Sequence, residues 1–189
     1  MNTPAHILIG AAAMARPSAR RTLIAAVLGG LAPDVSLFVL GGVSLFLLNI
    51  PPQVVFGELY FSDAWQTVFA IDNSVFVWGA ILGIALWRRS AVGIAFAGAA
   101  LLHLALDFPL HHDDGRAHFW PLTRWIFESP FSYWDSGQGA AIIAPLEGLI
   151  AAGALAVNWR NYALWRVRIA FSVVLVLEFW VIRQWLVFF

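Results

Sequence analysis

Long apolar segments constrain this chain more than any other feature. Of its 189 residues, 61% are hydrophobic and only 12% are charged, which is too little charge for a water-soluble domain of this length. A helix needs about 20 apolar residues to cross a bilayer. The sequence therefore predicts an all-α, polytopic membrane protein that folds as one domain over residues 1–189.

Six apolar stretches are expected to form the transmembrane helices. They are Pro4 to Ala15, Thr22 to Leu48, Asn73 to Trp87, Ala91 to Phe108, Ala140 to Val157 and Arg168 to Phe188. The second stretch is too long for one crossing, and Pro33 removes a backbone hydrogen bond near its middle, which predicts a break there. The first and third are short, so we expect tilt, cover by neighbouring helices or extension by flanking turns.

Two further segments need a separate interpretation. Aromatic residues recur at roughly helical spacing between Val54 and Ile71, which predicts an amphipathic helix lying in the membrane interface. The N-terminal apolar stretch differs from a signal peptide because its arginines follow the apolar run instead of preceding it. We expect it to be a helix of the mature protein.

Arginines gather in alternate connections between the expected helices. The connections after the first, third and fifth helices carry Arg16, Arg20, Arg21, Arg88, Arg89, Arg160, Arg166 and Arg168. The positive-inside rule makes these connections cytoplasmic. The acidic loops over residues 49–72 and 109–139 then face outward.

Charge and cysteine content limit the partners and the metal ligands that this chain can have. The formal net charge is zero, which argues against nucleic acid as a partner. The chain has no cysteine, so any metal must be bound by histidine nitrogen and carboxylate oxygen.

His103 and Asp107 are ionisable residues near the end of an apolar helix. They are four residues apart and share one helix face, where His111 continues the spacing. Ionisable groups at membrane depth cost several kcal/mol, and the chain has no lysine to neutralise them. The pair is typical of two ligands presented to one divalent cation, although a neutral histidine satisfied by an aspartate would also fix helix packing.

Counting residues along each helix places several titratable groups at a similar outer depth. These groups are His6, Asp34, Asp72, His103, Asp107 and Glu147. Their shared depth predicts one polar site inside the bundle. The segment that follows, residues 107–118, contains three histidines and three aspartates that can supply further ligands and an acid or base.

Four motifs together resemble a known family. They are Asn2-Thr3-Pro4-Ala5-His6, Gly30-Leu-Ala-Pro33-Asp34, His103-x-x-x-Asp107 and Ser132-Tyr133-Trp134-Asp135. The chain resembles the predicted membrane-bound metal-dependent hydrolases, bacterial inner-membrane proteins distantly similar to zinc-dependent phospholipase C-type enzymes. The resemblance implies a multi-pass protein of the bacterial inner membrane with a metal site that faces the periplasm. The implied ligands are His6, Asp34, His103 and Asp107.

The chain also departs from this family. Many relatives carry a His-Ser pair where the third helix opens, whereas this chain has Asp72-Asn73-Ser74. Asp72 then replaces the histidine as a ligand or base, or the site holds one metal where relatives hold more.

The sequence therefore predicts a metal-dependent hydrolase that cleaves an ester or phosphoester of a lipid-like substrate with metal-activated water. Zinc is the favoured metal, with manganese or iron as alternatives. Asp72, His111 and Glu147 are the candidates for moving the proton. The candidates for substrate binding are Arg116, Arg124 and His118, and an arginine would pair with an anionic headgroup. Two rivals remain open, a metal-ion or proton transporter and a structural protein with buried His-Asp pairs.

Overall fold

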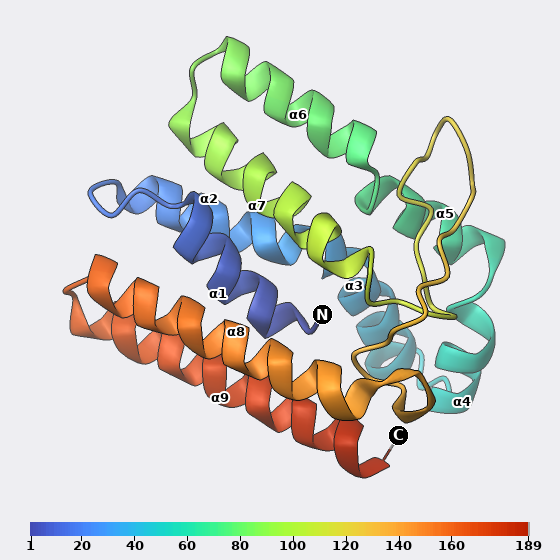
Figure 1. Cartoon of the computed structure of the whole chain (residues 1–189). Coiled ribbons are helices and arrows are strands. Elements are labelled where there is room, and N and C mark those ends of the chain that lie inside the picture. The colour runs from blue at the N-terminus through green and yellow to red at the C-terminus, as the bar shows by residue number, and fades with distance from the viewer. Residues whose placement is uncertain (189) are drawn as a thin grey trace.

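The computed structural model describes residues 1–188, and all regular structure in that range is helical, as the sequence predicted. The helices are α1 (Thr3–Met14), α2 (Arg20–Leu31), α3 (Val35–Gly42), α4 (Pro52–Val54), α5 (Asp63–Asp72), α6 (Val75–Trp87), α7 (Ala91–Asp107), α8 (Ala140–Asn161) and α9 (Trp165–Phe188). Figure 1 shows α8 and α9 side by side along one side of the molecule and α6 and α7 along another, with α1 and α2 between them.

Within residues 1–188, four helical segments are long and apolar enough to cross a membrane. They are Arg20–Leu47, Asp63–Trp87, Ala140–Asn161 and Trp165–Phe188. Two further apolar helices, α1 and α7, are shorter. Each of the six stretches expected from the sequence is thus found in an apolar helical segment, with ends that differ by a few residues.

The short helix α1 lies at the centre of the bundle. It packs against α2, α7, α8 and α9 (Figure 1). Ala5, Leu8 and Ala11 are fully buried, and the small side chains on this helix let its neighbours approach closely. Of the three possibilities for this short stretch, cover by neighbouring helices is the one observed.

The long second stretch breaks where Pro33 predicted. Helix α2 ends at Leu31, a 3₁₀ turn spans Ala32–Asp34, and α3 begins at Val35. Gly30, just before the break, packs directly on α1. The approach is so close that a Cβ atom at Gly30 would lie only 2.7 Å from the carbonyl oxygen of His6. The break therefore brings Asp34 close to the N-terminal half of α1.

The third stretch is extended by a preceding helix. Helices α5 and α6 meet at Asn73 and Ser74, and the Ser74 hydroxyl accepts the backbone N–H groups of Phe76 and Val77 at the start of α6. The same hydroxyl donates to the carbonyl oxygen of Trp120. These contacts attach the loop over residues 109–139 to the α5–α6 junction.

The predicted continuous helix over Val54 to Ile71 is wrong. The segment is divided into α4, a π-helical turn over Val55–Leu59, and α5. The Ser62 hydroxyl accepts the backbone N–H of Trp65 and so starts a new helix after the turn. Several of its aromatic residues are buried instead of forming a surface belt. Val55, Tyr60, Trp65 and Phe69 form a small hydrophobic core in residues 35–72, which we call the lobe.

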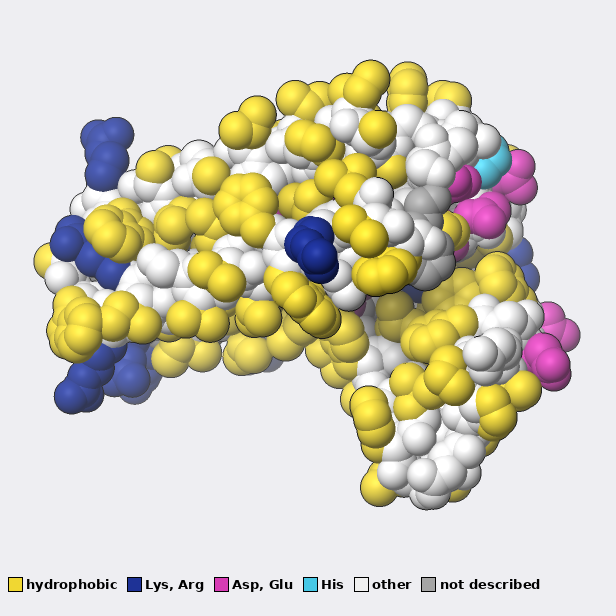
Figure 2. Space-filling model, turned by 90° about the horizontal axis from the view of Figure 1, so that it is seen from below, with side chains coloured by type: hydrophobic (Ala, Val, Ile, Leu, Met, Phe, Trp, Pro, Cys, Tyr) yellow, Lys and Arg dark blue, Asp and Glu magenta, His cyan; other side chains and the backbone are white. Residues whose placement is uncertain are grey.

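The two ends of the molecule differ in charge. The α1–α2, α6–α7 and α8–α9 connections lie at one end, and the lobe and the 109–139 loop lie at the other (Figure 1). On the face shown in Figure 2, arginine side chains gather at the first end and acidic side chains at the second. The fold therefore separates charge along its long axis as the sequence predicted.

Candidate metal centre

His103 and Asp107 lie on the last turns of α7 and face the same side. Both are buried, and His103 Nε2 lies 3.2 Å from Asp107 Oδ2. This contact follows from the four-residue spacing, which places the two side chains one helical turn apart.

His6 joins this pair from α1. Its Nε2 lies 2.8 Å from Asp107 Oδ1, and its ring stacks on the His103 ring with 3.6 Å between centroids and 15° between planes. His6, His103 and Asp107 each offer a ligand atom, and these atoms lie within 4.8 Å of one another. The Met1 α-amino group also donates to Asp107 Oδ1.

Asp34 approaches the triad from the 3₁₀ turn after α2. Its Oδ1 lies 3.6 Å from His103 Nε2, and its Oδ2 accepts a hydrogen bond from the Thr3 hydroxyl. Thr3 therefore fixes the orientation of this carboxylate. The structure brings together all four residues that the resemblance implied as ligands.

The donor set of this site fits a divalent cation. His103 Nδ1 lies 2.8 Å from the carbonyl oxygen of Gly30, which only accepts, so Nδ1 carries the hydrogen. In the neutral imidazole Nε2 then presents a lone pair, and within residues 1–188 this nitrogen has no hydrogen-bond partner. That lone pair faces the carboxylates of Asp107 and Asp34, an arrangement that is repulsive unless a proton or a metal ion lies between them. The buried His-His-Asp group can therefore hold a metal ion.

His111 extends the site toward the 109–139 loop. Its Nε2 lies 3.4 Å from Asp107 Oδ2, and its Nδ1 lies 2.9 Å from Asp114 Oδ1. Burial lowers the pKa of the His111 imidazole, but the two carboxylates outweigh burial and hold that pKa above its usual value. Burial raises the pKa of Asp114, and the neighbouring His111 and Arg116 outweigh it, so this pKa is lowered.

A cavity of about 480 Å³ opens beside the triad. Its polar wall includes Asp34, Asp107, His111, Asp114, Arg116 and Tyr133. Its apolar wall comes from Leu37 and Phe38 of α3 on one side and from Val174, Leu177 and Val181 of α9 on the other. Figure 2 shows hydrophobic side chains along the hollow between the lobe and the main body. The cavity thus has an acidic end beside the candidate metal-binding group and an apolar side.

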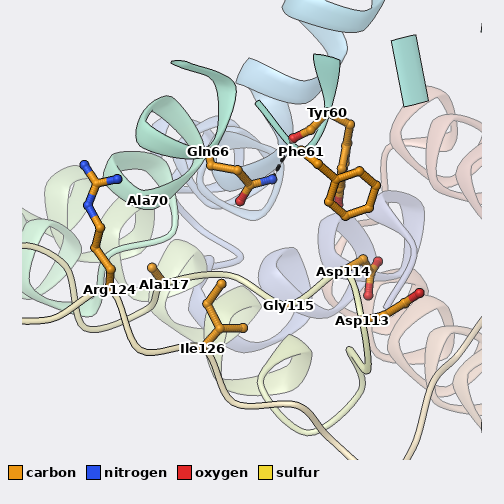
Figure 3. Close-up of a pocket in the computed structure, with 10 residues that line it drawn as sticks. All are labelled: Tyr60, Phe61, Gln66, Ala70, Asp113, Asp114, Gly115, Ala117, Arg124 and Ile126. Atoms are coloured by element: carbon orange, nitrogen blue, oxygen red, sulfur yellow. Dashed lines mark hydrogen bonds between the residues drawn. The ribbon is translucent and has the colours of Figure 1, made fainter. Parts of the chain in front are cut away.

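The two predicted substrate-binding arginines occupy different cavities. Arg116 lines the cavity beside the triad, with its guanidinium 4.3 Å from the Phe69 ring centroid and 4.8 Å from that of Tyr60. Its Nη1 is buried and has no hydrogen-bond partner within residues 1–188. Arg124 lines a smaller cavity of about 250 Å³, across from Asp113 and Asp114 (Figure 3), and donates to the Thr67 hydroxyl at 3.4 Å.

The remaining predicted residues lie outside the cavity beside the triad. His118 is buried with its Nδ1 3.0 Å from the carbonyl oxygen of Asn73, and burial lowers its pKa. Asp72 lines a hollow between α3 and α5 together with Ser36. Glu147 accepts the backbone N–H of Asn2. The roles assigned to these three residues stay predictions.

Sequence reasoning missed Glu178 and Tyr133 as members of this region. Glu178 is fully buried in α9, next to the start of α1. A lone carboxylate in a long apolar helix was a usable signal, because the cost of burying it applies there as it does to Asp107. Tyr133 appeared only as part of a motif, although its side chain lines the cavity.

No family model, no curated protein and no solved structure matches this chain. The chemistry of the site therefore has to be argued from its own residues.

Proposed function

We propose that this chain is a membrane-embedded, metal-dependent hydrolase that cleaves an ester or phosphoester of an anionic, lipid-like substrate. The observation that carries the proposal is the buried Nε2 of His103, which lies without a hydrogen-bond partner in residues 1–188 and faces the carboxylates of Asp107 and Asp34 beside a half-apolar cavity. The resemblance to membrane-bound metal-dependent hydrolases supports the same assignment, because its implied ligands are the residues that meet here.

Four residues would hold the metal: His6, Asp34, His103 and Asp107. A divalent cation bound there would supply Lewis-acid polarisation of the scissile group and an activated water molecule. The two-histidine, two-carboxylate donor set suits zinc, and manganese or iron are compatible with it. The Nδ1–H of His103 on Gly30 is the kind of outer hydrogen bond that orients metal-ligating histidines.

The surrounding residues support a division of roles. His111 lines the cavity and lies between Asp107 and Asp114, so it is suited to move a proton. Arg116 offers an unpaired guanidinium nitrogen to an anionic headgroup. Burial raises the pKa of Tyr133 well above its usual value, which keeps its phenol neutral as a hydrogen-bond donor.

The apolar wall supports a substrate with a hydrocarbon chain. Phe38 and Leu177 line the cavity and are also about half exposed, so the cavity reaches the surface between α3 and α9. Both belong to segments that are apolar enough to lie in a membrane. A lipid-like molecule can therefore place its chain between these helices with its headgroup at the polar end. By the positive-inside rule we place this end on the periplasmic side of a bacterial inner membrane.

The test is hydrolysis by the purified protein in detergent, loaded with Zn²⁺ or Mn²⁺. The substrates are phosphatidylglycerol and the soluble diester bis(para-nitrophenyl) phosphate. We expect cleavage that His103→Ala abolishes and that His112→Ala leaves unchanged, because His112 binds the carbonyl oxygen of Ser129 away from the triad. Absence of cleavage with either metal contradicts the proposal. Cation uptake into liposomes without cleavage would identify a transporter instead.

A further inference from the structure

Two buried carboxyl groups meet behind the proposed metal site. Glu147 of α8 is 1% exposed and Glu178 of α9 is 0% exposed, and the two carboxyl groups interact with each other. Neither lines the cavity beside the triad. Burying two acids among apolar helices is unfavourable unless hydrogen bonds and a shared proton compensate, so the partners of each oxygen need an explanation.

The partners belong to the first turn of α1. Ala5 donates its backbone N–H to Glu178 Oε2 at 3.1 Å, and the Asn2 side chain donates its Nδ2 to Glu178 Oε1 at 3.1 Å. The backbone N–H of Asn2 donates to Glu147 Oε1. Trp185 donates its Nε1 to Asn2 Oδ1 at 2.7 Å, which fixes the orientation of the Asn2 amide. The acid pair therefore accepts N–H groups at the N-terminal end of α1, where Ala5 also donates to the Asn2 carbonyl oxygen at 3.0 Å.

The proton of the pair can be located from these contacts. Both oxygens of Glu178 accept N–H hydrogen bonds, and so does Oε1 of Glu147. Oε2 of Glu147 is the carboxyl oxygen of the pair that lacks such a donor within residues 1–188. A hydrogen bond between two carboxyl groups requires that one of them carries a proton. A proton on Glu147 Oε2 that is donated to Glu178 satisfies every oxygen of the pair.

We propose that Glu147 and Glu178 share one proton, carried by Glu147 Oε2, and that the pair positions the first turn of α1 for metal binding. Thr3 and His6 lie on this turn and the next, where Thr3 holds Asp34 and His6 contacts Asp107. The two glutamates are thus positioning residues that act through α1. This inference rests on the proposed metal site, and it replaces proton transfer as the role of Glu147.

Glutamine substitutions test the pair because the two positions are expected to respond differently. In Glu147→Gln, the amide NH₂ replaces the protonated Oε2–H as a donor, so the network is retained. In Glu178→Gln, the NH₂ must face either the N–H of Ala5 or the Nδ2 of Asn2, both of which are donors. One capping hydrogen bond is then replaced by a repulsive contact.

The measurements are Zn²⁺ affinity and amide hydrogen exchange of the α1 segment in the full chain in detergent. We expect Glu147→Gln to keep Zn²⁺ affinity within about twofold and to leave α1 protected. We expect Glu178→Gln to lose about 10- to 100-fold in Zn²⁺ affinity, the range for groups that orient metal ligands, and to increase exchange in α1. Equal damage from both variants, or none from either, overturns the proposal.

Measurements of kcat and of hydrogen exchange distinguish failure of the positioning role from failure of the proposed function. A Glu147→Gln protein with normal Zn²⁺ affinity and abolished kcat would make Glu147 a proton carrier and overturn the positioning role. If the wild-type protein binds no metal, the proposed function fails, while hydrogen exchange still decides whether the pair holds α1. Should Glu178→Gln not fold, Asn2→Ala removes one bond to Glu178, and unchanged α1 exchange in that variant counts against the pair.

Discussion

Gly30 donates no side chain to the site, yet its carbonyl oxygen orients His103 through a 2.8 Å hydrogen bond from Nδ1. On its other side Gly30 packs against the main chain of His6, where a Cβ atom would lie 2.7 Å from the carbonyl oxygen and 3.1 Å from the carbonyl carbon. One residue of α2 thus sets both the approach of α1 and the tautomer of a ligand on α7. The proposed metal site depends on this backbone contact.

Replacing Gly30 with alanine is expected to damage both stability and metal binding. The new methyl group forces α1 away from α2, and overpacking of this kind costs about 1–3 kcal/mol. Zn²⁺ affinity should fall about tenfold or more, because His6 and the hydrogen bond to His103 shift together. The measurements are the thermal unfolding midpoint and Zn²⁺ titration in detergent.

Gly41→Ala is the matched control for this substitution. Gly41 lies in α3, and no atom of residues 1–188 outside its own turn of the helix lies within 4 Å of the added Cβ position, so alanine should be neutral or stabilise the helix by about 0.5–1 kcal/mol. An equal loss of Zn²⁺ affinity in both variants would show that the Gly30 contact is not specific to the site.

Removal of His103 tests the metal centre directly. We expect the wild-type protein to retain a stoichiometric divalent cation on purification and His103→Ala to lose it, with affinity reduced more than about 100-fold, because even outer partners of ligands are worth 10–100-fold. Elemental analysis of both proteins provides the measurement, with His112→Ala as the control. Equal metal content in wild type and His103→Ala would contradict the assignment of His103 as a ligand.

Much of the site was predictable because ionisable residues inside apolar segments can be recognised in the sequence. His103 and Asp107 were found from their four-residue spacing in an apolar helix, and depth counting placed His6 and Asp34 at the same level. Depth alone does not give direction around a helix axis. Asp72 and Glu147 were counted at that same depth, yet Asp72 lines a hollow between α3 and α5, and Glu147 accepts the backbone N–H of Asn2 outside the cavity beside the triad.

The helical architecture was predictable from apolar length, and the break at Pro33 followed from its missing N–H. The packing around α1 was not, because a short run of small residues does not reveal how many helices surround it. At the break within residues 54–71, the Ser62 hydroxyl donates to the Leu59 carbonyl oxygen and accepts the N–H of Trp65, and these local contacts compete with a regular amphipathic pattern. Capping of this kind interrupts the helix even though the helical spacing of the aromatic residues continues across the break.

Arg116 and Arg124 provide a test of substrate charge. Arg116→Ala is expected to raise KM for phosphatidylglycerol about 10- to 100-fold, the worth of one charge-assisted hydrogen bond, because Arg116 lines the cavity beside the triad and its Nη1 has no hydrogen-bond partner in residues 1–188. Arg124→Ala should leave KM unchanged, since Arg124 lines the other cavity. Steady-state kinetics with the anionic lipid and with uncharged diacylglycerol separate charge recognition from misfolding. Equal KM effects from the two arginines would contradict the assignment.

The pH dependence of stability is expected to include a contribution from His118. Burial lowers the pKa of His118 below its ordinary value of 6.5, so the unfolded chain binds a proton near that pH while the folded protein does not. This contribution to stability is therefore complete above pH 6.5 and is lost as the pH falls, at a rate of at most about 1.4 kcal/mol per pH unit. His118→Gln keeps a donor for the Asn73 carbonyl and removes the titration, so its unfolding midpoint should fall less between about pH 7.5 and about pH 5. His112→Gln, from the same loop, is the control, and an identical acid-induced fall in wild type and His118→Gln would rule this contribution out.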